Sequence, residues 1–264
     1  MNSTYQLKQV KDGVYQILES GLDAMYLICG SERSILIDTG AGTGDLKSVI
    51  GKVTDTPADV YLTHGHRDHF GGATQFPQVY LSPRDLGLAG AVDVDSRKEY
   101  VRKMVAAGAA DESVLQAMMV LDWGMGPQIL PVRDGDRIET GDRTLVCMEA
   151  PGHTDGSVIY YDEKNNIIFS GDAANPIMVL RKSGDMDYKT YIHNWIGRIK
   201  EINEMIDDET CICAGHGIIP REAWYQLMET AERYLEGKLL PERRKIHFYD
   251  NLFLINGNVS IMLG

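Results

Sequence analysis

The sequence has 264 residues, of which 44% are hydrophobic and 24% are charged, and its formal net charge is -12. These values are typical of one large globular domain, and they oppose binding to nucleic acid or to an anionic membrane, which attract clustered Lys and Arg. No apolar run approaches about 20 residues, and residues 1–10 are polar, so we expect no membrane span and no signal peptide. Four cysteines in or beside apolar stretches favour a reducing cytoplasm.

Short apolar runs bounded by turn residues predict a series of strands in the first third of the chain. We expect these strands at residues 14–18, 24–29, 34–37, 60–63 and 79–81. A short helix is predicted at 45–52, with Asp45 or Thr43 as its cap, and another helix start is predicted at Gly71 and Gly72.

The segment at about 83–127 interrupts this series of strands. It contains two predicted helices, whose apolar residues recur at helical spacing. These helices are expected at 96–107 and 111–121. Beyond it, strands are predicted within 129–148 and at 158–161, 166–170, 210–214 and 251–262, and helices at 187–206 and 220–236. The chain therefore reads as a single domain with a helical insertion at 83–127 and a C-terminal extension at 220–264.

Four potential metal ligands fall within six residues directly after the predicted strand at 60–63: His64, His66, Asp68 and His69. Imidazole and carboxylate groups are good ligands for a divalent metal such as zinc. A polar surface loop is the alternative interpretation. Four such side chains at a strand end are hard to explain in that way, because crowded polar groups are costly unless something binds them.

Three later motifs also place a ligand type just past a predicted strand, beside glycine or another small residue. They contain His153 within 151–157, Asp172 within 169–172 and His216 within 213–217. Five of the seven histidines fall in these four motifs, and the other two, His193 and His247, are expected to be structural or exposed. Strand ends at one edge of a sheet can converge, so the motifs predict one shared metal site.

These motifs, together with Asp38 in the segment 36–40, resemble the metallo-β-lactamase fold in its hydrolase branch, which includes glyoxalase II, lactonases and related esterases. The resemblance extends from about residue 10 to about residue 218. It implies an α/β fold of four layers, in which two mixed β-sheets pack face to face with helices on both outer sides.

The resemblance also implies two divalent metal ions, with zinc expected and iron or manganese as alternatives. It gives the first ion His64, His66 and His153. It gives the second ion Asp68, His69 and His216. Asp172 would bridge the ions, and a hydroxide held between them would attack the substrate while Asp68 orients it and moves a proton. Asp38 would fix a ligand or a loop by hydrogen bonding, or it is only a turn residue after a strand.

Single positions argue against several branches of the family. His66 stands where flavodiiron oxidoreductases have glutamate, and Asp172 is absent from class B β-lactamases. Gly217 and Ile218 replace the glutamate and tyrosine that follow the last histidine of glyoxalase II. Asn175 stands where the known quorum-signal lactonases place a tyrosine.

The predicted function is a dinuclear metal hydrolase that cleaves a small ester, thioester, lactone or phosphodiester. Two alternatives stay open: a mononuclear iron enzyme like the persulfide dioxygenases of this fold, and a metal-containing ligand-binding protein with little turnover. Trp123, Met125 and Asn175 are the expected pocket residues. The charged run 242–245 is expected to be solvated surface, or to offer Arg243 or Arg244 to an acidic substrate. A homodimer is left open.

Overall fold

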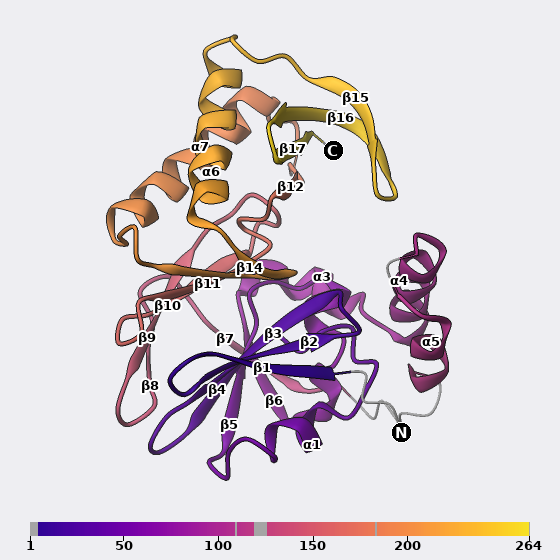
Figure 1. Cartoon of the computed structure of the whole chain (residues 1–264), viewed down its shortest axis with the longest axis vertical. Coiled ribbons are helices and arrows are strands. Elements are labelled where there is room, and N and C mark those ends of the chain that lie inside the picture. The colour runs from indigo at the N-terminus through magenta and orange to yellow at the C-terminus, as the bar shows by residue number, and fades with distance from the viewer. Residues whose placement is uncertain (1–4, 109, 119–125, 183, 264) are drawn as a thin grey trace.

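The structure, a computed structural model, describes residues 5–108, 110–118, 126–182 and 184–263, and strands in these residues form three sheets (Figure 1). The first sheet has seven strands in chain order. They are β1 (Tyr5–Lys11), β2 (Val14–Glu19), β3 (Asp23–Cys29), β4 (Ser34–Ile37), β5 (Ala58–Tyr61), β6 (Gln78–Leu81) and β7 (Gln128–Pro131). The alternating sequence of β1 leaves most of its side chains exposed, so its apolar signal was too weak for the strand to be predicted.

The second sheet has six strands in the order β14-β13-β11-β10-β9-β8. Their bounds are β8 (Arg137–Glu139), β9 (Thr144–Glu149), β10 (Val158–Asp162), β11 (Ile167–Gly171), β13 (Cys211–Ala214) and β14 (Gly217–Ile219). Side chains of both sheets share one buried cluster, which includes Tyr26 and Ile28 from β3 with Tyr160 and Phe169 from the second sheet. The two sheets therefore pack face to face, and the predicted fold class is confirmed.

Side-chain alternation along β3 explains how the first sheet buries both of its faces. Tyr26 and Ile28 point between the sheets, whereas Met25 and Leu27 point outward. The outer cluster is covered by α1 (Leu46–Ile50), α2 (Arg67–Phe70) and η1 (Ala73–Gln75). The side chain of Asp45 accepts a hydrogen bond from the Ser48 amide, so Asp45 is the cap of α1 as predicted.

The predicted helix start at Gly71 and Gly72 is confirmed for Gly72, which is the N-terminal cap of η1, a single short turn of 3-10 helix. Helix α2 forms inside the histidine motif itself, and Gly71 is its C-terminal cap. A side chain at Gly71 would lie 2.5 Å from the carbonyl oxygen of Ala41, and one at Gly72 would lie 2.4 Å from that of Thr39. Both glycines therefore also let two backbone segments approach each other closely.

Between β6 and β7 the chain forms helices in the segment predicted as an insertion. This segment contains η2 (Pro83–Asp85), α3 (Leu86–Gly90), α4 (Val94–Ala106) and α5 (Glu112–Met118). Helices α4 and α5 lie side by side at the flank of the first sheet (Figure 1), and α4 packs against α2. Trp123 and Met125, two of the expected pocket residues, lie outside the described residues.

The structure also has a third sheet of four strands, in the order β12-β17-β16-β15, of which β16 and β17 were predicted at 251–262 whereas β12 and β15 were not. Its strands are β12 (Ile177–Leu180), β15 (Glu242–Ile246), β16 (Tyr249–Asn256) and β17 (Val259–Leu263). It packs with α6 (Tyr188–Glu204) and α7 (Arg221–Leu235) on the outer side of the second sheet (Figure 1). β15 is the charged run 242–245, which is exposed as expected but forms an edge strand.

Among the described residues, no helix is long and apolar enough to cross a membrane. All four cysteines are free thiols. The cytoplasmic location and the homodimer remain predictions.

Candidate metal centre

All seven predicted ligands converge on one edge of the two-sheet sandwich. His64 and His66 follow β5, and Asp68 and His69 lie on α2. The other three residues come from the second sheet, where His153 follows β9, Asp172 follows β11 and His216 follows β13. The ligand atoms form two groups, and within each group all atoms lie within 4.8 Å of one another. The groups are His64, His66 and His153, and Asp68, His69, Asp172 and His216.

The Asp172 carboxylate lies between these two groups. Its Oδ2 atom is 3.5 Å from His153 Nε2 and 3.4 Å from His216 Nε2. Its Oδ1 atom is 3.5 Å from His69 Nε2. One carboxylate thus faces imidazole nitrogens of both groups.

Hydrogen bonds from two imidazole rings to backbone carbonyl oxygens fix which nitrogen faces the cluster. His153 Nδ1 donates to the carbonyl oxygen of Val179 at 2.9 Å, and His216 Nδ1 donates to that of Leu22 at 3.0 Å. A carbonyl oxygen only accepts, so Nδ1 carries the proton and Nε2 of the neutral ring presents its lone pair inward. His66 is arranged differently, because its Nδ1 atom faces inward, 2.9 Å from His153 Nε2.

Asp38 anchors the loop that carries the first histidines. Its carboxylate accepts hydrogen bonds from the Thr63 amide and the Thr63 hydroxyl, both at 2.8 Å, and lies 2.8 Å from His69 Nδ1. Its backbone adopts φ +62°, which is costly for a residue other than glycine and persists only where the surroundings enforce it. The contacts match the predicted hydrogen-bonding role of Asp38 and exceed what a simple turn residue needs.

Asn175 is buried, and its amide donates to Asp172 Oδ1 at 2.7 Å. It was predicted as a pocket residue. In the structure its described polar contact is with the shared carboxylate, so it orients Asp172. Gly215 lies on the other side of the same carboxylate, where a side chain would come within 2.4 Å of Asp172 Oδ1.

The buried histidines have the chemistry expected of metal ligands. The Nε2 atoms of His64 and His69 are buried and have no hydrogen-bond partner among the described residues. An unsatisfied buried polar atom costs about 1–3 kcal/mol, so such atoms need an explanation. A divalent cation accepted by these lone pairs supplies one, and the donor set of imidazoles and carboxylates fits it.

The two groups differ in protonation before any metal binds. Burial and the neighbouring histidines lower the pKa of His64 well below its ordinary value, and burial together with the His153 charge lowers the pKa of His66 to about 3. Burial also lowers the pKa of His216, but the charge of Asp172 outweighs it and raises the pKa to about 10. The pKa of His69 is raised in the same way by Asp38 and Asp172. The first group is therefore neutral at pH 7, whereas the second holds protons.

Three residues that support the cluster were missed in the sequence. Asp85 is buried and accepts hydrogen bonds from the Gly65 amide, the Gly156 amide and the Thr154 hydroxyl at 2.7–2.9 Å. It thereby ties the loop of His64 and His66 to the loop of His153. A lone aspartate after a proline gives no sequence signal for such a role.

Asp23 and Tyr100 are the other two. Asp23 is buried, its Oδ1 atom lies 3.6 Å from His216 Nδ1, and it accepts a hydrogen bond from the Tyr100 hydroxyl at 2.6 Å. Tyr100 belongs to α4, so the helical insertion reaches the second group of ligands. The two residues are 77 positions apart, and no local pattern links them.

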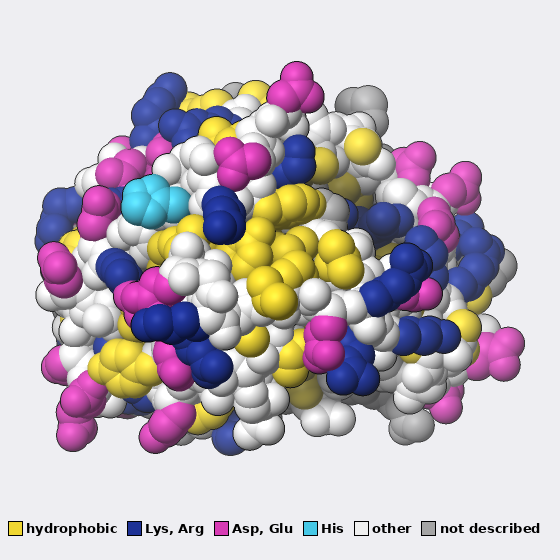
Figure 2. All heavy atoms as spheres, turned by 90° about the horizontal axis from the view of Figure 1, so that it is seen from above, with side chains coloured by type: hydrophobic (Ala, Val, Ile, Leu, Met, Phe, Trp, Pro, Cys, Tyr) yellow, Lys and Arg dark blue, Asp and Glu magenta, His cyan; other side chains and the backbone are white. Residues whose placement is uncertain are grey.

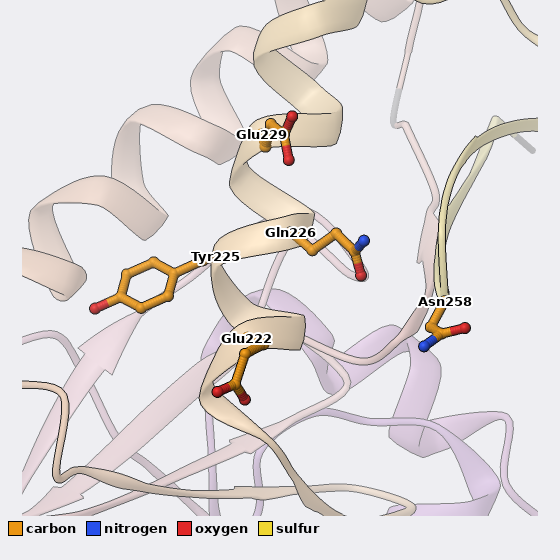
Figure 3. Close-up of a pocket in the computed structure, with 5 residues that line it drawn as sticks. All are labelled: Glu222, Tyr225, Gln226, Glu229 and Asn258. Carbon is orange, nitrogen blue, oxygen red and sulfur yellow. The ribbon is translucent and has the colours of Figure 1, made fainter.

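A separate pocket lies on the outer face of α7 (Figure 3). It is lined by Glu222, Tyr225, Gln226, Glu229 and Asn258, and Figure 3 shows Tyr225 pointing away from Gln226 and Asn258. None of the predicted site residues lines it. His193 and His247 are exposed and belong to neither ligand group, as expected.

A family model described as the metallo-beta-lactamase superfamily matches residues 23–81 and 102–217, which is more than half of the chain. The chain belongs to the metallo-beta-lactamase superfamily. Both matched segments together contain all seven ligand residues. Residues 82–101 and 218–264 lie outside the match, and they comprise part of the helical insertion and most of the C-terminal extension.

Curated members of the superfamily resemble this chain over most of its length. An acyl-coenzyme A thioesterase, MBLAC2 of Bos taurus, is 30% identical over 228 residues, which cover 77% of each protein. A hydroxyacylglutathione hydrolase of Hamiltonella defensa is 24% identical over 241 residues, which cover 85% of this chain and 79% of that protein. These relatives support the prediction of a hydrolase that acts on ester-type bonds.

A solved structure shows the same fold. A metallo-beta-lactamase from Erythrobacter litoralis superposes with a TM-score of 0.59 at 14% identity, and the match covers 88% of this chain and 98% of that chain. The predicted family and fold class are both confirmed.

Proposed function

We propose that this protein is a dinuclear metal-dependent hydrolase that cleaves an acyl thioester. The position of Asp172 is the observation that carries the proposal. A carboxylate within 3.5 Å of histidines from both ligand groups suits the bridging of two ions, whereas a mononuclear enzyme does not need it. The thioester is favoured among the ester-type substrates because the 30% identical relative is named as an acyl-coenzyme A thioesterase.

The ligand groups divide between the two ions in a simple way. His64, His66 and His153 would hold the first ion, and Asp68, His69 and His216 the second. The intact second group is the reason to favour a hydrolase over a mononuclear iron dioxygenase. Zinc suits these imidazole and carboxylate ligands, and iron and manganese are the alternatives for the test.

Two divalent ions bound there would lower the pKa of a shared water and polarise the scissile carbonyl group. The protein's own residues would then position the reactants. Asn175 holds one oxygen of Asp172, and Asp38 holds His69. Asp68 would accept a proton as the nucleophile attacks and deliver it to the leaving group.

The electrostatics of Asp68 agree with this role. Burial raises the pKa of its carboxylate, but the charge of His69 outweighs burial, so the net pKa lies below the ordinary value. Asp68 is therefore an anion at neutral pH and able to accept a proton. The His216 side chain is 41% exposed, so the cluster opens to solvent on the side of the second group.

The proposal is tested by removing metal with a chelator and restoring zinc, manganese or iron separately. We expect about two ions per chain by elemental analysis and hydrolysis of acyl thioesters in preference to esters, lactones and phosphodiesters. The Asp172→Asn variant should lose about three orders of magnitude in kcat/KM, which corresponds to about 4 kcal/mol. Asp142→Asn is the matched control, because Asp142 is a partly exposed aspartate that pairs with Lys164 on the surface.

Full metal occupancy without turnover of any of these four substrate classes would overturn the hydrolase proposal. Full activity of the Asp172→Asn variant would overturn the bridging role. Rapid oxygen uptake with one iron per chain would favour the dioxygenase instead.

A further inference from the structure

The third sheet presents different side chains on its two faces, because residues alternate along each strand. One face packs against α6 and α7 through Leu180, Leu254, Ile261 and Leu263. The opposite face carries a separate apolar cluster with Val179, Phe253 and Met262 at its centre. The alternation of Ile177 and Val179 along β12 continues to Arg181, which therefore follows the second face.

At the end of β12, backbone hydrogen bonds connect the third sheet to the loop that carries His153. The Val179 carbonyl oxygen accepts the hydrogen bond from His153 Nδ1, and the Arg181 amide donates to the Gly152 carbonyl oxygen at 3.1 Å. The Tyr191 hydroxyl lies 2.9 Å from the carbonyl oxygens of both Gly152 and Arg181. Arg181 thus has a backbone held directly beside a metal ligand.

The Arg181 side chain is exposed and forms no ion pair with a carboxylate of the described residues. Two other arginines of the third sheet are paired: Arg243 with Asp250 and Arg244 with Glu242. Each of these two arginines of the charged run 242–245 therefore already has a carboxylate partner within the protein. Arg181 is the arginine near the metal centre with a guanidinium available for a ligand.

Tyr249, at the start of β16, approaches the same place from the second face of the sheet. Burial raises the pKa of its hydroxyl, the Arg181 charge lowers it, and Asp68 and Asp172 raise it. The register of the third sheet agrees, because Leu180 and Leu252 both pair with Leu263, so the end of β12 before Arg181 and the start of β16 at Tyr249 lie at the same edge of the sheet.

We infer that Arg181 and Tyr249 form an anion-binding subsite beside the metal centre, which holds a carboxylate or phosphate group of the substrate. The inference rests on the proposed function and narrows its substrate to anionic acyl thioesters. A guanidinium offers paired donors that match the oxygens of either anion, and a phenol adds one more donor. The net charge of -12 disfavours the approach of anions, so a local cation is required to bind one. Figure 2 shows basic and acidic side chains interspersed around a central apolar area on the face seen from above.

The test uses the metal-loaded enzyme and two pairs of substrates. A glutaryl thioester of N-acetylcysteamine against its pentanoyl counterpart tests a carboxylate on the acyl part. Butyryl-coenzyme A against butyryl-pantetheine tests phosphates on the thiol part. Arg181→Met should lower kcat/KM for the anionic member of one pair by roughly 10–100-fold, chiefly through KM, and leave the neutral member within about twofold. Arg181→Lys should recover part of the loss, and Tyr249→Phe should lose about three- to tenfold.

Arg243→Met is the matched control, because it removes the same charge from the same sheet at an exposed position that has its own carboxylate partner. It should leave both pairs unchanged. Equal losses for charged and neutral substrates, or equal effects of Arg181→Met and Arg243→Met, would overturn the subsite.

A second measurement separates this inference from the hydrolase proposal. Calorimetric titration with glutarate and with coenzyme A reports anion binding without turnover. Binding to the wild-type protein that weakens tenfold or more in Arg181→Met supports the subsite even if no thioester is cleaved. Absence of binding and of charge preference together would overturn it.

Discussion

The metal centre and the groups that surround it come from different parts of the chain. All seven candidate ligands lie in the segments that the family model matches, 23–81 and 102–217. Two residues that hold groups beside the centre lie outside those segments: Asp85 and Tyr100. The segments that the family model matches, called the framework below, therefore carry the candidate metal-binding residues. The insertion and the third sheet hold the loops on which these residues lie.

The comparison is tested most severely at Asp85, an insertion residue that holds two framework loops together. Asp85→Ala leaves the amides of Gly65 and Gly156 and the Thr154 hydroxyl without their acceptor. We expect a loss of about 3 kcal/mol or more in the free energy of unfolding, measured by urea denaturation, because each unsatisfied buried group costs about 1–3 kcal/mol. Metal affinity should fall as well.

Asp45→Ala is the control for this experiment, since Asp45 is an exposed cap of α1 in the framework. It should cost about 1 kcal/mol and leave metal affinity unchanged. If the two variants were equally stable and bound metal equally well, the insertion would not support the framework in the way described.

A second prediction compares the two ligand groups within the framework. His69 and His216 have raised pKa values, near 10 for His216, so they are protonated in the metal-free protein at pH 7.5. These protons stabilise the metal-free fold fully below the unfolded pKa of about 6.5, and that contribution is lost as pH rises through the folded pKa. Metal requires the neutral rings, so its binding releases the protons.

Metal affinity of the second group should therefore rise about tenfold per pH unit for each released proton between pH 7 and 9, or about 1.4 kcal/mol. His64, His66 and His153 have lowered pKa values and should release none. Calorimetry of zinc binding in two buffers with different ionisation enthalpies measures this directly. Identical heats in both buffers would contradict the predicted protonation of the second group.

The smallest predicted effect concerns the hydrogen bond between Tyr100 and Asp23. Tyr100→Phe removes a donor from a buried carboxylate beside His216, and we expect a loss of about 1–2 kcal/mol in stability. The activity should fall tenfold at most. Tyr225→Phe, which removes a surface hydrogen bond to Asp208, is the control and should do neither. Equal behaviour of the two variants would show that α4 only packs beside the centre.

The convergence of the seven candidate ligands could be predicted from the sequence because each motif is local. A short apolar strand, a small residue and a histidine or aspartate stand together in the chain, as in the segment around His153. The residues that hold the loops around the centre could not be predicted in this way, because the two partners of each hydrogen bond are far apart in the sequence. Asp85 and Thr154 are 69 residues apart, and a lone polar residue does not reveal a distant partner.

The same reasoning explains why the strands of the two large sheets were largely predicted, whereas β12 and β15 of the third sheet were not. β12 pairs in parallel with β17, some 80 residues later in the chain, and it has only four residues. β15 consists mainly of charged residues and lacks an alternating apolar signal. Both β12 and β15 therefore form because of tertiary contacts and not because of a local sequence pattern.

The alternation along β12 has a consequence for how such a protein can diverge. Deletion or insertion of one residue between Asp172 and Arg181 would move Arg181 to the opposite face of the third sheet, because side chains alternate along a strand. The seven ligands would keep their places while the neighbouring cation disappeared. A lineage could therefore exchange a preference for anionic substrates for a preference for neutral ones by a change in length alone, without a substitution at any ligand.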